Sequence, residues 1–119
     1  MQDSLIVNKS KAFAIRIVKL YQFLTETKRE YIMSKQMLRS GTSIGANVKE
    51  SVYAQTRADF HTKLTIALKE TSETLYWLEL LFETGYLTTE AFNSINSDCI
   101  ELLKLLTAIT KKTKTGKGE

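Results

Sequence analysis

The stretch TRADFHTKLTIALKETSETLYWLELLFETG, residues 56–85, decides the fold. Residues of one face recur in it at spacings of three and four over about six turns, which is the period of an amphipathic α-helix. They are Phe60, Leu64, Ala67, Leu68, Thr71, Leu75, Leu78 and Phe82. Thr56 and Asp59 have the spacing of a capping box at the start, and Gly85 stands where a glycine ends a helix. The stretch therefore predicts one long helix.

Three further stretches show the same period. A first helix is expected at about residues 5–25 and a second at about 31–54, and a fourth follows Thr88, with Glu90 near the positive end of its dipole. Their apolar faces are, in turn, Phe13, Ile17, Leu20 and Leu24; Met37, Gly41, Ile44, Val48 and Val52; and Phe92, Ile95, Cys99, Leu102, Leu106 and Ile109. Short loops make neighbouring helices antiparallel. The sequence predicts an all-α, antiparallel up-and-down four-helix bundle.

One domain accounts for nearly the whole chain. With 119 residues, 43% of them hydrophobic and none of them proline, the chain is long enough to bury a single core. We place the bundle at residues 1–110. Residues 111–119 hold lysine, threonine and glycine but no apolar side chain, and we expect a disordered lysine-rich tail there.

No residue pattern points to catalysis, a cofactor or a metal. Cys99 is the single cysteine and is expected to be a small buried apolar residue. His61 is the single histidine and lacks the Glu-x-x-His partners of a di-iron bundle. The glycines near Lys49 lack the Gly-Lys-Ser/Thr ending of a phosphate loop. No secretory signal or long apolar run is present, so a cytosolic protein without a membrane span is expected.

Gly41 and Gly45 lie inside the second predicted helix. Each costs about 1 kcal/mol relative to alanine in a helix interior. Close approach of another helix backbone would explain both, because neighbouring Ser40 and Ala46 are also small. The alternative is a break in the helix near Gly41.

The charges are unevenly distributed. The net charge is +4, yet residues 1–58 hold ten basic and four acidic side chains, whereas residues 59–110 hold three basic and eight acidic ones. Opposite charge on the two halves favours head-to-tail association of copies, which closes into a ring when the rotation allows. The aromatic pair Tyr76-Trp77 is the expected anchor of such a contact.

Polar residues on the second and third helices offer two interpretations. Ser43, Asn47 and Glu50 share one side of the second helix, and Glu70 and Glu73 share one side of the third. They form either a solvated face or a polar network between helices that fixes register and subunit pairing. Together with Tyr76 and Trp77 they are our candidate residues for an oligomer interface or polar seam.

The chain also resembles a known family. The resemblance is carried by RSGTSIGANVKES at 39–51, LTIALKETSE at 64–73, YWLELL at 76–81, and the short motifs at residues 59–60 and 85–87. It resembles the bacterial four-helix bundle family, also called the 23S rRNA intervening-sequence proteins. The resemblance implies a ring-shaped homopentamer without enzymatic activity. The related accessory variability protein of diversity-generating retroelements forms a basic pentamer that engages a reverse transcriptase and nucleic acid.

Two functions follow as hypotheses. The first is a non-enzymatic oligomer, a ring of five copies, that acts as a scaffold or as an adaptor for a partner protein. The alternative is an accessory protein that binds the phosphates of RNA or DNA through basic side chains. The candidate phosphate contacts are Lys9, Lys11, Arg16, Lys19, Lys28, Arg29, Lys111, Lys112, Lys114 and Lys117.

Overall fold

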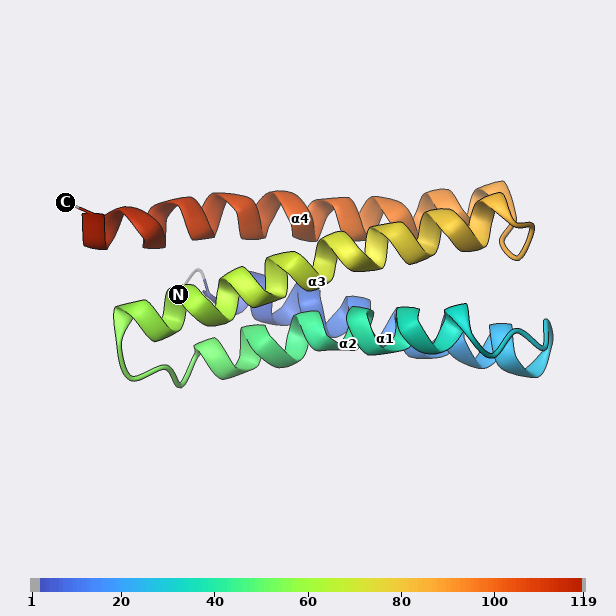
Figure 1. The fold of residues 1–119 in the computed structure, drawn as a ribbon, viewed down its shortest axis with the longest axis horizontal. Coiled ribbons are helices and arrows are strands. Elements are labelled where there is room, and N and C mark those ends of the chain that lie inside the picture. The colour runs from blue at the N-terminus through green and yellow to red at the C-terminus, as the bar shows by residue number, and fades with distance from the viewer. Residues whose placement is uncertain (1–2, 119) are drawn as a thin grey trace.

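Four helices run alternately up and down along one long axis (Figure 1). The structure, a computed structural model, describes residues 3–118 and the side chains of residues 5–114. The helices are α1 (Asp3–Glu26), α2 (Met33–Ser51), α3 (Arg57–Glu83) and α4 (Thr89–Gly118). The molecule measures 50 × 22 × 21 Å. The predicted antiparallel four-helix bundle is confirmed.

Neighbouring helices do not pack equally. α2 packs extensively on both α1 and α3, and α3 on α4, whereas α1 and α4 touch least. α1 begins and α4 ends toward the end of the bundle that carries the α2–α3 connection (Figure 1). No helix in the described part of the chain is both long and apolar enough to cross a membrane.

One core fills the space between the helices, and each predicted face contributes to it. Its most deeply buried large side chains are Phe13, Ile17, Leu24, Met37, Ile44, Leu64, Leu78, Leu81, Leu102 and Leu106. Cys99 is fully buried and unpaired. Burial, and then the nearby charge of Asp98, raise the pKa of its thiol to about 12. The interpretation of Cys99 as a core residue is confirmed.

The ends of α3 follow their sequence signals. The Thr56 hydroxyl accepts a hydrogen bond from the Asp59 amide at 3.0 Å and caps the N-terminus. At the other end Gly85 has a φ of +90°, a conformation that favours glycine. The Tyr86 amide then donates to the Leu81 carbonyl at 2.9 Å, as in a Schellman motif. The predicted start and stop of α3 are therefore correct.

α2 is shorter than the predicted 31–54. Its first turn is capped by Glu30, whose carboxylate accepts from the amides of Ile32 (3.1 Å), Met33 (3.0 Å) and Ser34 (2.7 Å). Burial acts to raise the pKa of Glu30, but these hydrogen bonds outweigh it, so the pKa lies below its ordinary value. Val52, expected on the apolar face, is 46% exposed because the helix ends at Ser51.

α4 is longer than expected. It continues as a helix through Gly118, where the sequence had suggested a disordered tail from residue 111. No proline interrupts this segment. In addition, the Thr113 hydroxyl is hydrogen-bonded to His61 Nδ1 and donates to the Thr110 carbonyl at 3.1 Å, so this turn is attached to α3. Glu119 lies outside the described residues.

Gly41 and Gly45 mark a close crossing of α1 and α2. A Cβ atom added at Gly41 would lie 2.9 Å from side-chain atoms of the fully buried Ile17. One added at Gly45 would lie 3.3 Å from the backbone oxygen of Ser10. The predicted small-residue seam is confirmed, and α2 shows no break at Gly41.

Candidate functional site

A network of charged side chains joins α2 to α3. Arg39 Nη2 donates to Glu73 Oε2 at 2.6 Å, and Arg39 Nη1 lies 3.4 Å from Glu70 Oε1. Trp77 Nε1 donates to the same Glu73 oxygen at 3.1 Å. The hydrogen bond from Arg39, and then that from Trp77, lower the pKa of Glu73. Glu70 and Glu73 thus both contact α2, with side chains that are 20% and 38% exposed.

Behind this network lies a second, fully buried polar contact. The hydroxyls of Ser40 on α2 and Thr74 on α3 are hydrogen-bonded at 2.8 Å, and both residues have no exposed surface. Glu70 Oε1 is also buried and accepts no hydrogen bond from the described residues, and Arg39 Nη1 lies 3.4 Å from it. The α2–α3 seam is therefore fixed in register by polar groups.

The three polar candidates on α2 do not act together. Ser43 Oγ donates to the Arg39 carbonyl at 2.7 Å, and Asn47 Nδ2 donates to the Ser43 carbonyl at 2.9 Å, so both bonds stay within α2. Glu50 alone reaches another helix, where Lys63 Nζ lies 3.0 Å from its carboxylate. Of this trio, only Glu50 belongs to the network between helices.

The basic and acidic halves pair partly within one chain. Lys9 of α1 forms an ion pair with Glu101 of α4 at 3.0 Å. Arg16 does so with Asp98 at 2.7 Å, and its other nitrogen donates to Ser94 Oγ at 2.9 Å. Two of the candidate phosphate contacts are thus already engaged, and less of the charge asymmetry remains for contacts between copies.

The remaining candidate phosphate contacts lie at different places along the bundle. Lys28 and Arg29 belong to the α1–α2 connection, at the opposite end from the last turns of α4 (Figure 1). Lys111, Lys112 and Lys114 are exposed on those last turns. Lys11 and Lys19 are exposed along α1, and the Lys117 side chain lies outside the described residues. The nine basic residues whose side chains are described do not form one patch on a single chain.

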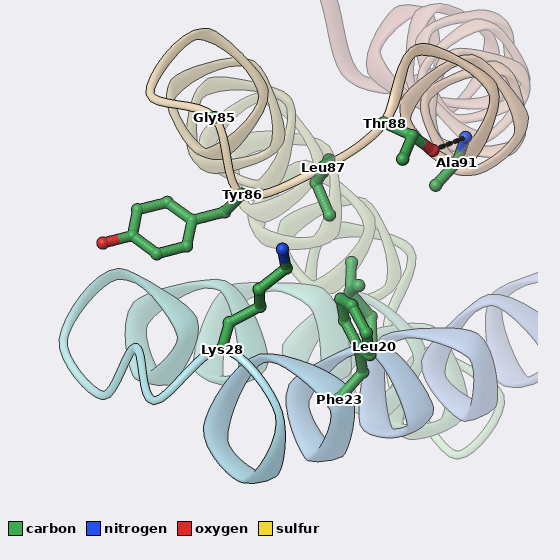
Figure 2. A pocket seen from close by; sticks show the side chains of 8 residues that line it. All are labelled: Leu20, Phe23, Lys28, Gly85, Tyr86, Leu87, Thr88 and Ala91. Carbon is green, nitrogen blue, oxygen red and sulfur yellow. Dashed lines mark hydrogen bonds between the residues drawn. The ribbon is translucent and has the colours of Figure 1, made fainter.

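Two shallow apolar cavities flank α1. Figure 2 shows the first, about 410 Å³, where the end of α1 faces the α3–α4 turn. Leu20, Phe23, Leu87 and Ala91 line it, and the Lys28 side chain extends into it. Among the described side chains, no three His, Cys, Asp or Glu residues gather where they could hold a metal ion.

The second cavity is a groove of about 320 Å³ on the outer side of the α1–α2 crossing. Its lining residues are Val7, Lys11 and Ala14 of α1 and Thr42, Gly45, Ala46 and Lys49 of α2. Ala14 and Thr42 lie at one end, Lys11 lies beside Gly45 and Ala46 in the middle, and Val7 and Lys49 lie at the other end. We call this cavity the α1–α2 groove.

The aromatic pair on α3 divides between core and surface. The rings of Tyr76 and Trp77 meet edge to face, with centroids 5.0 Å apart and planes at 72°. Trp77 packs against the core, whereas Tyr76 is 55% exposed. Only Tyr76 is available as an anchor for a partner.

The family of the chain follows from a comparison with known families. Residues 2–108 match the family model described as 23S rRNA-intervening sequence protein. The chain belongs to this family. A crystal structure from Bacteroides thetaiotaomicron, described as a protein of unknown function from the S23 ribosomal protein family, superimposes with a TM-score of 0.91 at 58% identity. That similarity covers 93% of this chain and 99% of the other. No curated protein matches the chain significantly.

Neither of these descriptions names a catalytic activity. In this 23S rRNA-intervening sequence protein, reasoning from the sequence identified Glu50, Glu70 and Glu73 but missed their partners Arg39 and Lys63. It also missed the α1–α2 groove, although a signal was present: Ala14, Gly45 and Ala46 are small residues on helices expected to cross closely. Ala14 and Ala46 on the outer side of the crossing have side chains too short to fill the space between the two helices.

Proposed function

We propose that the protein is a non-enzymatic scaffold or adaptor that assembles into a closed ring of identical copies. The observation that carries the proposal is the exposure of large apolar side chains outside a core that is already complete. Ile15 and Val18 on α1 are 49% and 39% exposed, and Tyr76 on α3 is 55% exposed. Apolar surface of this kind marks sites of association when it is contiguous and rimmed by polar groups.

Unlike faces favour a ring over a two-fold dimer. The apolar residues on α1 lie beside lysines, and Tyr76 lies beside glutamates, so the two surfaces differ in charge. A contact between unlike surfaces is head-to-tail, and it ends only when the ring closes. The number five comes from the family resemblance, and we propose a pentamer on that ground.

The test is the native mass of the full chain at micromolar concentration. Native mass spectrometry together with light scattering should give a discrete multiple of the 13.6 kDa chain, with five copies as the expected number. A single-chain mass under these conditions would contradict the proposal. A different closed number would contradict only the pentamer.

A second candidate function is the binding of RNA or DNA, which is favoured by basic side chains at one end of the bundle. Arg57 and Lys114 line the same cavity there, and Lys111 is exposed one turn earlier on α4. A ring would repeat this end in every copy, and repetition raises the avidity of weak contacts. Such contacts would be to phosphates, so filter-bound RNA or DNA should be lost steeply as salt rises. No retention of either nucleic acid at low salt by the intact oligomer would exclude this candidate.

A further inference from the structure

We propose that the α1–α2 groove receives Tyr76 and Glu79 from α3 of a second copy of this chain. The inference rests on the proposed function, because it names the two surfaces that meet in the ring. It goes further by naming the surface that receives, called the acceptor, and the surface that inserts, called the donor. It also gives their alignment along the bundle.

The acceptor is a groove of small residues with two lysines along it. Ala14 of α1 and Ala46 of α2 lie in its walls, and at Gly45 the backbone of α1 comes close to α2. Val18 follows Ala14 by four residues on the same face of α1 and is 39% exposed, so apolar surface continues beyond the groove. A planar aromatic ring can lie against alanine and glycine without displacing any larger side chain.

α3 exposes Thr62 and Lys69 on the side that also carries Tyr76. The donor is the part of this side toward the end of the helix, with Ser72, Tyr76, Glu79 and Glu83. They recur at spacings of four, three and four, so they form one ridge along the helix. Tyr76 is held in place by its edge-to-face contact with Trp77, which Glu73 in turn fixes through the indole nitrogen. An aromatic side chain that is ordered before binding loses little conformational entropy when it docks.

The spacing of charge matches on the two surfaces. Lys11 precedes Ala14 by three residues, and Lys49 follows Ala46 by three residues. The two helices are antiparallel and Gly45 lies beside Ser10, so Ala46 is level with Lys11 rather than with Ala14. Lys11 therefore lies one turn from Ala14, and Lys49 lies one turn further in the same direction along the bundle. Glu79 likewise lies three residues beyond Tyr76. When the tyrosine ring rests on Ala14, Glu79 therefore lies level with Lys11. Glu83, one turn further along α3, then lies level with Lys49.

These charges are also among those that form no ion pair within the described part of the single chain. Lys9, Arg16 and Arg39 form ion pairs with acidic residues of their own chain. Lys11 and Lys49 form no ion pair with any described residue, and Glu79 and Glu83 also have none within the described part of the chain. Groove and ridge lie on different helices, so each copy can offer both at once, as a closed ring requires.

The experiment removes each surface separately. Tyr76→Ala removes the anchor, and Ala46→Glu places a carboxylate in the groove where Tyr76 and Glu79 would dock. Both positions are exposed, so the helical content and melting temperature should stay close to those of the wild type. We expect each variant to lose the oligomer mass and to run as a single chain. The matched controls are Tyr53→Ala and Ala108→Glu, at exposed positions outside both surfaces, which should keep the oligomer.

Mixing the two variants tests the head-to-tail arrangement. The Tyr76→Ala chain keeps its groove and the Ala46→Glu chain keeps its ridge, so one intact contact remains between unlike chains. At the highest soluble concentration the mixture should give a one-to-one dimer and nothing larger. A mixture that contains only single chains would overturn the assignment.

Charge reversal tests the register. Glu79→Lys should weaken assembly, and adding Lys11→Glu in the same chain should restore it. If the wild type is oligomeric and both Tyr76→Ala and Ala46→Glu remain so, the two surfaces are wrong while the ring proposal stands. If the wild type is a single chain, the proposed function fails and this inference fails with it.

Discussion

The two seams that hold α2 in the bundle are built in opposite ways. On the α3 side, polar groups fill the seam: Ser40 bonds Thr74 in the interior, and Arg39 bridges two glutamates at the surface. On the α1 side, the seam is close because side chains are missing, at Gly41 and Gly45. A seam of polar groups fixes register through direction-dependent bonds. A seam of small residues fixes distance, and it leaves a groove on the outside.

The largest effect is expected where bulk enters the α1–α2 seam. Gly41→Leu must displace the fully buried Ile17, because even a Cβ atom would lie 2.9 Å from it. Overpacking of this kind costs about 1–3 kcal/mol and occasionally more. In chemical denaturation, the lower free energy of unfolding should appear as a lower midpoint concentration of denaturant, while the dependence of that free energy on denaturant stays unchanged.

Alanine at position 41 tests the same close contact with a smaller change. Gly41→Ala adds only the crowded Cβ, so we expect it to destabilise despite alanine's higher helix propensity. Ala108→Leu on the exposed face of α4 is the control and should change little. A Gly41→Leu protein as stable as the wild type would show that α1 and α2 do not cross closely there.

The next effect concerns the polar seam. Thr74→Val keeps the shape but leaves the buried Ser40 hydroxyl without its partner on α3, which costs about 1–3 kcal/mol. Thr74→Val with Ser40→Ala removes both groups and should cost less than the sum of the single changes. A double-mutant cycle measures this coupling. Additive single effects would mean that the two hydroxyls contribute independently.

A third effect is pH-dependent and lies at the start of α2, the helix that both seams share. The pKa of Glu30 is lowered in the folded protein from its ordinary value of 4.5. The stabilisation from its carboxylate is therefore present above pH 4.5 and is lost as the pH falls through the lower folded-state pKa. Glu30→Gln should cost about 1 kcal/mol near neutral pH, as loss of a helix cap does.

Unfolding curves at several pH values test this assignment. The difference between Glu30→Gln and the wild type should shrink steadily below pH 4.5, because the wild-type carboxylate becomes protonated. Glu26→Gln, an exposed residue at the end of α1, serves as the control. A difference that is constant down to strongly acidic pH would mean that the charge of Glu30 does not stabilise α2.

The smallest effect is expected at the surface of the polar seam. The Arg39 side chain is 50% exposed, so Arg39→Met should cost less than about 1 kcal/mol, and added salt should reduce the difference. Glu73 should then regain a pKa nearer its ordinary value, because its strongest hydrogen bond is lost. NMR titration of the Glu73 carboxylate checks this, and an unchanged pKa would contradict the importance of the Arg39 bond.

The parts of this molecule that the sequence predicted depend on local signals. The face of α3, its Thr56 cap and its Gly85 stop are all set by residues within a few turns of one another. Glu30 was missed because Ser, Thr, Asp and Asn are the usual capping residues, so a glutamate before a helix gives no signal. The length of α4 was missed because residues 111–118 have no apolar period, and the contact of Thr113 with His61 joins residues 52 positions apart.

For the charged contacts between helices, the sequence indicated one partner but not the other, because the other partner lies far away in the chain. Periodicity placed Glu70 and Glu73 on one side of α3, but the choice of Arg39 as their partner depends on the register of two helices. Likewise, nothing local connects Lys9 to Glu101 or Arg16 to Asp98. The excess charge of each half was correct as a count, yet part of it is used between α1 and α4 of the same chain.

The burial of Cys99 makes the protein a reporter of its own unfolding. The chain has one thiol, it has no exposed surface, and its pKa of about 12 keeps it protonated near neutral pH. A thiolate is the species that reacts with alkylating reagents, so the folded bundle should not be labelled. Each labelled molecule will then have opened far enough to release α4 from the core. The rate of labelling therefore measures how often the bundle opens, without any probe having been added.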